Sequence, residues 1–261
     1  MASNEELKSF ILPLIDTIQS DRGDARVNAL GTVWNLSAVD ENGVYMGSKD
    51  LGLLPALVAV ISSDRGGARV NALGTLMNLS VTEENRAYMG SKDLGLAYAL
   101  VAVVSSDRGD ARMNALGTLW NLSALNENGV YMGSKDLGLL PALVAVASSS
   151  SGDARMNVLG ILMNLSVTED NRAYMGSKDL GLLPALIAVV SSDSGEARVN
   201  ALGTLTNLSA ADENRVYMGS QDVGLVPALV AVVSSDSGDA RVKALGSLWN
   251  LSAANENRVY M

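Results

Sequence analysis

Apolar residues recur along this chain at spacings of three and four, and no segment shows the strict alternation that is typical of a strand. In residues 84–124 the pattern predicts a short first helix within ENRAYMGSKD, closed by Gly95, and a second helix over AYALVAVVSS. The turn SSDRGD follows, with Ser and Asp as capping residues and Gly as a breaker. A long third helix is predicted over ARMNALGTLWNLSA. We therefore expect an all-α protein built from groups of three helices.

This three-helix pattern repeats with a constant period. Tyr-Met pairs recur every 43 residues and end at Met46, Met89, Met132, Met175, Met218 and Met261. The segment FILPLIDTIQSD near the N-terminus is in register with LLPALVAVISSD, so the first repeat lacks its first helix. A period of this length is typical of solenoids with two or three helices per repeat. We expect a single array over 1–261, with repeats at about 1–40, 41–83, 84–126, 127–169, 170–212 and 213–261.

The motif GTLWNLSA carries a resemblance to a known family. Together with G-x-x-P-A-L-V in the second helix and E-N-R in the first, it resembles armadillo repeats, most closely those of the adenomatous polyposis coli protein and the catenins. The resemblance covers the whole chain and implies a right-handed solenoid whose third helices line a concave groove. The repeats are more alike than those of many armadillo proteins, as is expected of an engineered, reconstructed or recently duplicated array.

One face of the third helix is marked by polar residues. At about 100° per residue, Asn114, Gly117 and Asn121 share a face, Trp120 lies at its edge, and the leucines between them point to the core. The resemblance implies that this face lies in the groove and that Asn121 binds the main chain of an extended peptide. The matching asparagines are Asn35, Asn78, Asn164, Asn207 and Asn250. Asn71, Asn114 and Asn157 are predicted to line the same groove.

The chemistry of these residues suits a peptide-binding role. A carboxamide both donates and accepts a hydrogen bond, and a peptide main chain needs both. Two extended residues span about 6.6 Å and stacked helices lie about 8–10 Å apart, so one amide per repeat can meet every second ligand residue. The residues that precede the motif asparagines are expected to wall the side-chain pockets. They are Trp34, Met77, Trp120, Met163 and Trp249, with Thr206 at the fifth position.

Each of these features also has a structural explanation. The asparagines could brace the third helix against its neighbours, and the Trp and Met side chains could pack between repeats. The glycine four residues before each Asn could leave room for a ligand side chain or for a neighbouring helix. The arginines of the third helices, such as Arg26, point away from the groove, and we expect them to brace the repeats through carboxylates such as Asp50.

Composition and charge limit the classes of partner that the chain is expected to bind. The net charge of −9 argues against nucleic acid and against an anionic membrane. Acidic residues near the start of the third helices favour a neutral to basic peptide, although they also suit helix capping. They are Asp24, Asp110, Asp153, Glu196 and Asp239.

The chain has no Cys and no His, which excludes disulfides, thiolate chemistry, His-based catalysis and the usual zinc sites. We expect no cofactor and no enzymatic activity. The first residues do not form a secretory signal and no apolar stretch approaches a membrane span, so an intracellular location, cytoplasmic or nuclear, is expected.

Two functions follow from these patterns. The first is a protein-interaction scaffold that binds an extended peptide segment of a partner along the groove. The alternative is a purely structural or synthetic array, or a fragment of a longer solenoid, with no native ligand. The array has no clear polar capping repeats, and on this alternative its ends should associate end to end.

Overall fold

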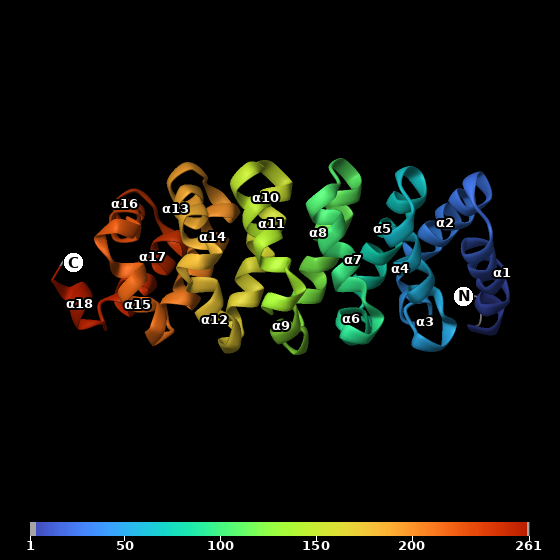
Figure 1. Cartoon of the computed structure of the whole chain (residues 1–261), viewed down its shortest axis with the longest axis horizontal. Coiled ribbons are helices and arrows are strands. Elements are labelled where there is room, and N and C mark those ends of the chain that lie inside the picture. The colour runs from blue at the N-terminus through green and yellow to red at the C-terminus, as the bar shows by residue number, and fades with distance from the viewer. Residues whose placement is uncertain (1–3, 260) are drawn as a thin grey trace. The chain divides into compact units, whose positions relative to one another are not determined.

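A computed structural model describes residues 4–259 and residue 261; residues 1–3 and 260, which belong to the first and last predicted repeats, lie outside it. The described residues form α-helices and short 3-10 helices, with no strand among them (Figure 1). They divide into two compact units, 1–128 and 129–261, each of which is described by itself. The expected all-α class is confirmed, whereas the single six-repeat array and its boundaries stay predictions.

The helices follow the predicted order. The second helices of the repeats are α1 (Asn4–Ser20), α4 (Leu53–Ser63), α7 (Leu96–Ser106), α10 (Leu139–Ser149), α13 (Leu182–Ser192) and α16 (Leu225–Ser235). The third helices are α2 (Gly23–Ser37), α5 (Gly66–Val81), α8 (Gly109–Ser123), α11 (Gly152–Val167), α14 (Gly195–Ser209) and α17 (Gly238–Leu251). The first helices are α3 (Asp40–Met46), α6 (Glu83–Gly90), α9 (Asn126–Met132), α12 (Glu169–Gly176), α15 (Asp212–Gly219) and α18 (Asn255–Arg258).

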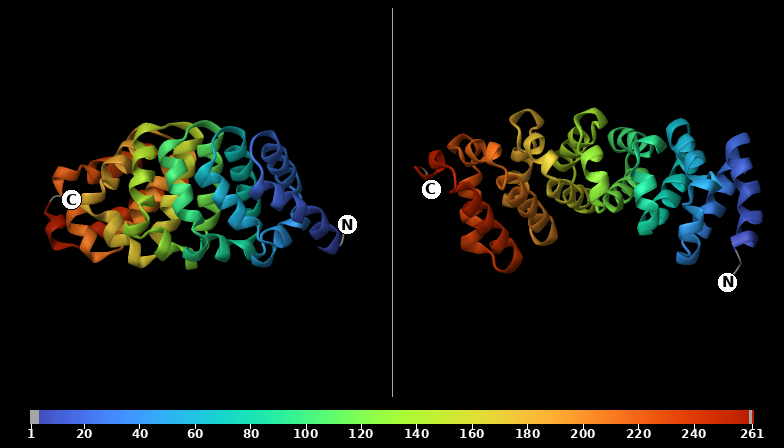
Figure 2. Two further views of the ribbon diagram at one scale, coloured as in Figure 1. Left: turned by 45° about the vertical axis from the view of Figure 1, so that its right-hand side comes forward. Right: turned by 90° about the horizontal axis from the view of Figure 1, so that it is seen from below.

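Consecutive third helices make the most extensive contacts. In the first unit α5 packs against both α2 and α8, and in the second α14 packs against both α11 and α17. Figure 2 shows the helices of each unit stacked in chain order in two further views. The leucines that were predicted to face the core are fully buried, as at Leu116 and Leu119. Aliphatic packing on one side of the third helix therefore leaves the Asn side for other contacts.

The first helix ends earlier than predicted. The predicted helix ran through ENRAYMGSKD to Gly95, but α6 ends at Gly90 and a 3-10 helix, η2 (Lys92–Leu94), follows. Gly95 adopts φ 72° between η2 and α7, a conformation that favours glycine. A 3-10 helix also follows the first helix in the other repeats, at η1 (Lys49–Leu51), η3 (Lys135–Leu137), η4 (Lys178–Leu180) and η5 (Gln221–Val223). The turn before the third helix is also shorter than SSDRGD, because α7 extends to Ser106 and α8 begins at Gly109.

The E-N-R motif joins the first helix to the rest of the unit. Asn85 is buried, and its Nδ2 donates to the carbonyl of Leu79 at 2.9 Å and to that of Gly43, in the preceding first helix, at 3.0 Å. Arg86 donates to the carbonyls of Ser80 and Val81 at the end of α5. These carbonyls have no partner within the helix, so the motif caps α5 while it joins two repeats.

The arginines of the third helices brace the repeats, but not through the expected carboxylates. Arg26 is 4% exposed and pairs with Asp64 at 2.8 Å, and Arg69 pairs with Asp107 at the same distance. The expected pairing with Asp50 is wrong. Each of these acids directly follows the second helix of the next repeat, where the stacking of repeats brings it to the arginine. In the second unit, Arg155–Asp193 at 2.9 Å and Arg198–Asp236 at 2.7 Å repeat the arrangement.

The ion pair changes the titration of its acid. Burial by itself raises the pKa of Asp107, but hydrogen bonds from Arg69 and Ser106 and the charge of Arg69 outweigh it and lower the pKa. The ionised form is therefore favoured in the folded chain. The stability that this contributes is complete above the unfolded pKa of about 3.9 and is lost as the pH falls through the lower folded pKa.

We predict that Asp107→Ser lowers the free energy of unfolding by about 3 kcal/mol at pH 7, because it leaves the Arg69 guanidinium buried without a carboxylate. The chain itself has Ser at the corresponding position 150. Asp50→Ser is the control; it removes an exposed carboxylate and should cost about 0.5 kcal/mol or less. Urea unfolding followed by far-UV circular dichroism measures both.

The same pair of proteins gives a pH test. The stability difference between Asp107→Ser and the unaltered chain should be constant from pH 7 to about pH 5 and should shrink below about pH 4, where the unfolded chain binds the proton. An equal loss from Asp50→Ser, or a difference that persists at low pH, would contradict the Arg69–Asp107 brace.

Candidate functional site

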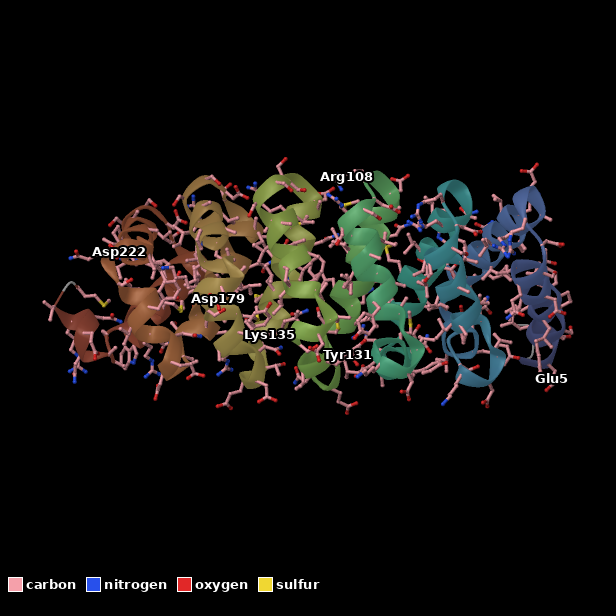
Figure 3. All side chains as sticks on the ribbon, viewed as in Figure 1. Glu5, Arg108, Tyr131, Lys135, Asp179 and Asp222 are labelled. Carbon is pink, nitrogen blue, oxygen red and sulfur yellow. The ribbon has the colours of Figure 1, made fainter. Side chains whose placement is uncertain are left out.

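The candidate site is the side of the third helices that carries the motif asparagines, which we call the Asn face. In the first unit it is formed by α2, α5 and α8 with Asn35, Asn78 and Asn121, and in the second by α11, α14 and α17 with Asn164, Asn207 and Asn250. Arg108, labelled in Figure 3, caps the start of α8 and marks the edge where the third helices of the first unit begin. Asn35 is exposed and the other five asparagines are half-buried.

In both units, motif asparagines bond serines of the preceding third helix. Asn78 Nδ2 donates to Ser37 Oγ at 3.0 Å, and Asn121 Nδ2 donates to Ser80 Oγ at 2.9 Å. In the second unit Asn207 bonds Ser166 at 2.9 Å, and Asn250 bonds Ser209 at 3.1 Å.

Each of these serines belongs to the preceding repeat and is itself fixed. Its hydroxyl donates to a main-chain carbonyl three residues earlier, as Ser37 does to Trp34 at 2.7 Å and Ser80 to Met77 at 2.7 Å. The hydroxyl therefore accepts from the amide with its own hydrogen already used. These asparagines are thus braces, as the structural alternative held. For Asn78, Asn121 and Asn207 the bond to serine is the only side-chain hydrogen bond among the described residues, whereas Asn250 Nδ2 also donates to the carbonyl of Thr206 at 3.2 Å.

The Trp and Met side chains pack toward the next repeat. A Cβ added to Gly74 would lie 2.6 Å from Trp34 Cε2, and one added to Gly117 would lie 2.9 Å from Met77 Sδ. Gly203 stands in the same relation to Met163, at 3.0 Å. At Gly74, Gly117 and Gly203 the glycine therefore makes room for a side chain of the preceding third helix, which is the structural one of its two explanations.

These large side chains are still accessible from outside. Trp34, Met77, Trp120 and Met163 are half-buried, and Trp249 is 80% exposed. Their contribution to ligand pockets stays a prediction. The asparagines earlier in the helices are also partly accessible; Asn71, Asn114 and Asn157 are half-buried, and Asn71 Nδ2 donates to the carbonyl of Val27 at 3.2 Å.

The fifth and sixth repeats depart from this arrangement. Thr206 stands where the other repeats have Trp or Met, and Lys243 stands where they have Asn. Thr206 Oγ1 lies 3.0 Å from Ser247 Oγ and 2.8 Å from the carbonyl of Leu202, so a polar contact replaces the aromatic or thioether contact. A repeat-by-repeat reading of the sequence locates both departures but does not show the contact.

Acidic side chains border the Asn face. Asp24, Asp110, Asp153, Glu196 and Asp239 lie in the first turns of their third helices, and all are exposed. A carboxylate at this end of a helix is stabilised by the helix dipole, and it also presents negative charge to a ligand.

The described residues lack two further kinds of feature. No group of three or more metal-binding side chains lies close enough together to hold an ion. None of the described helices is both long and apolar enough to cross a membrane.

Sequence reasoning missed two of the polar contacts that join neighbouring repeats. The serine that accepts from each motif Asn lies two residues beyond the Asn of the preceding repeat, within the same NLS triplet. The buried Asn85 was seen only as part of E-N-R. Both lie at a constant distance from their partners along the chain, 41 residues for Asn78–Ser37 and 42 for Asn85–Gly43. A search for complementary polar residues about one repeat apart could have found them.

No family model and no curated protein matches the sequence. Solved structures do match. A computationally designed armadillo repeat protein for modular peptide recognition is similar with a TM-score of 0.80 at 18% identity, over 92% of this chain and 99% of that one. A designed armadillo repeat protein in complex with the peptide (KR)4 is similar with a TM-score of 0.78 at 16% identity, over 92% and 99%.

The chain has the armadillo-repeat fold. An engineered protein with a TM-score of 0.78 at 18% identity, covering 94% of this chain and 97% of its own, agrees with this. The armadillo-like solenoid expected from GTLWNLSA is confirmed. The close similarity of the 43-residue repeats indicated an engineered, reconstructed or recently duplicated array. The solved structures named here are themselves of designed or engineered proteins.

We predict that Gly74→Ala lowers the free energy of unfolding by about 1–3 kcal/mol, because the new methyl group displaces the Trp34 ring. Gly31→Ala is a matched control at the same helix position, where the methyl group would meet only Asn71 Nδ2, at 3.4 Å. It should raise stability by up to about 1 kcal/mol through helix propensity. Thermal and urea unfolding measure both variants.

A double substitution tests the cause. In a Trp34→Ala background, Gly74→Ala should no longer destabilise, because the clashing ring is gone. If Gly74→Ala stabilises the unaltered chain as Gly31→Ala does, the packing of Trp34 on this glycine is refuted.

Proposed function

We propose that this protein is a non-enzymatic scaffold that binds an extended segment of a partner protein along the groove lined by its third helices. The observation that carries the proposal is the row of half-buried asparagines whose amides are held in place but not fully used. Asn121 donates one Nδ2 hydrogen to Ser80, and its side chain makes no other hydrogen bond among the described residues. The same holds for Asn78 and Asn207.

The serine brace supports this role by orienting the amide. A carboxamide is planar, so a fixed N–H also fixes the direction of the second N–H and of Oδ1. A side chain that is ordered before binding loses less entropy when a ligand arrives. The remaining donor and acceptor match those of a peptide main chain, and this match does not depend on the ligand sequence.

The spacing of the repeats supports an extended ligand. One amide per third helix recurs at roughly the 8–10 Å that separates packed helices, and every second residue of an extended chain recurs at about 6.6 Å. A curved stack brings the lining side chains closer than the helix axes, which reduces the difference. Alternate ligand side chains would then face the half-buried Trp and Met residues.

The charge of the border favours a neutral to basic segment. Five exposed carboxylates stand at the starts of third helices, and lysine or arginine side chains of a ligand would complement them. The designed armadillo neighbour that holds (KR)4 binds a basic peptide of this kind. Because the carboxylates are exposed, this part of the affinity should weaken as salt is added.

We predict that Asn78→Ala combined with Asn121→Ala weakens the binding of peptides selected on the unaltered chain. The Kd should rise at least tenfold, because two contacts with the peptide main chain are lost. Peptides selected from a random library by panning, and then measured by fluorescence anisotropy, provide the test.

Ser37→Ala combined with Ser80→Ala is the matched control. It removes the same two bridges but keeps both amides, so it should lower stability while it changes Kd by a few-fold at most. Equal effects of the two double variants on binding would make the asparagines braces only, and would sink the proposal.

A second candidate function is a structural array whose copies associate end to end, and the surfaces of α2 and α17 favour it. Inside the units Arg26, Arg69, Arg155 and Arg198 pair with an Asp of the next repeat, and Trp34, Met77 and Met163 cover a Gly of the next third helix. In this 261-residue chain α17 exposes Arg241 and Trp249, and the first repeat exposes Asp21 and Asn35. We propose that these are the two halves of one further junction, filled by a second copy.

Charge reversal tests this junction. Arg241→Asp and Asp21→Arg should each be monomeric in sedimentation velocity at concentrations where the unaltered chain associates, because like charges then meet. An equimolar mixture of the two variants should restore association, since both junctions between unlike variants then join opposite charges. A concentration-independent monomer for the unaltered chain would contradict end-to-end association.

A further inference from the structure

Lys243 is a cation in a row of amides. The four preceding third helices have Asn71, Asn114, Asn157 and Asn200 at this position. Lys243 is half-buried, and its ammonium group makes no hydrogen bond or ion pair among the described residues, although its main-chain carbonyl accepts from Thr206 Oγ1 at 3.0 Å. Its Nζ lies 3.4 Å from the point that a Cβ of Gly203 would occupy, so the ammonium group reaches from α17 onto the Asn face of α14.

The acid nearest to Lys243 along the chain is Asp239, one turn earlier on α17; it is exposed and makes no ion pair with the ammonium group among the described residues. Gly203 is flanked by Met163 Sδ on α11 and by the Lys243 ammonium on α17. Asn207, four residues after Gly203, lies on the same face of α14, and its amide keeps one N–H and its Oδ1 free after the bond to Ser166. A partly desolvated ammonium group beside a free amide N–H is a pair of donors without an acceptor.

Thr206 keeps this part of the face open. At Gly74 and Gly117 the space above the glycine is filled by Trp34 or Met77. At Gly246 only the methyl group of Thr206 comes within 4 Å of an added Cβ, at 3.4 Å. The small residue is held by hydrogen bonds from its hydroxyl, so it does not swing over the glycine. The replacement of Trp or Met by Thr therefore coincides with the replacement of Asn by Lys one helix later.

We propose that Lys243 and Asn207 form a carboxylate-binding subsite on the Asn face of the second unit. This inference rests on the proposed peptide-binding function. It adds one position on the Asn face that favours an acidic group, whereas the carboxylates at the border, such as Glu196 and Asp239, favour basic residues. The carboxylate is either an acidic side chain or the C-terminal carboxylate of the bound segment. An acid at one position among neutral and basic ones sets the register of the ligand on the face.

The test uses an array of synthetic peptides, each made with a free and with an amidated C-terminus, and with Asp or Asn at every position of the sequences that bind. Peptides that bind the unaltered chain should prefer the carboxylate form at one position by roughly tenfold or more. The two arms of the array distinguish a side-chain carboxylate from a terminal one.

Lys243→Asn is the decisive variant, because it restores the residue of the other repeats and so keeps the fold. It should abolish the preference for the carboxylate form and leave the affinity for the uncharged form within about twofold. A preference that is unchanged in Lys243→Asn would overturn the subsite and make Lys243 a solvated surface residue.

A transplant gives an independent test. Met163→Thr combined with Asn200→Lys, in the Lys243→Asn background, places the same pair one repeat earlier. The position of the preferred carboxylate in the peptide should then move by about two residues. A preference that does not return at any position would count against the Thr–Lys pair as the cause.

These outcomes separate the subsite from the function on which it rests. If the affinity of the peptides falls in the Asn78→Ala, Asn121→Ala variant but their carboxylate preference is unchanged in Lys243→Asn, the proposed function stands and the subsite alone is overturned. An array on which no peptide binds the folded chain overturns both.

Discussion

The close packing of consecutive third helices is the constraint on which the rest of this structure depends. A glycine on one helix admits the Trp or Met of the preceding one, and a motif Asn bonds the preceding serine beside it. The contact uses one small residue, one large residue and one hydrogen bond, and it is present at Gly74, Gly117 and Gly203. The Arg–Asp pairs at the far side of the helices fix the same stacking. Both sides of the third helix are thus tied to its neighbours, and the half-buried Asn face is the surface that this leaves.

On the proposed function, the motif Asn is a brace and a binding group at once. An amide has more hydrogen-bonding groups than a single serine can satisfy, so the bond to serine leaves a donor and an acceptor of Asn78, Asn121 and Asn207 without a partner among the described residues. The asparagine that best supports the neighbouring helix is therefore also the one whose orientation is best fixed for a ligand. A purely structural reading explains the serine bond, but it does not use the second half of the amide.

The helices and the buried leucines could be predicted from the sequence because apolar spacing reports directly on a helix face, and the motif GTLWNLSA identified the fold. The end of the first helix could not be predicted in this way. The residues Lys92–Leu94, which form a 3-10 turn, are followed by Gly95 and so resemble the last turn of an α-helix in sequence. The partner of Arg26 was also mistaken. Periodicity shows that Arg26 and Asp64 recur together, but only the stacking of the repeats shows that Asp64, and not Asp50, lies beside the guanidinium. The serine bonded by each Asn was hidden for the same reason.

The most direct test of the central claim is a scan of main-chain N-methylation along one bound peptide, measured by isothermal titration calorimetry. An N-methyl group removes a main-chain donor and leaves the side chains unchanged. If the asparagines read the main chain, methylation at every second residue should weaken binding by about tenfold or more, and the positions between should tolerate it. A scan without this alternation, or one in which no position matters, would show that the peptide is held by its side chains and that the asparagines only brace the stack.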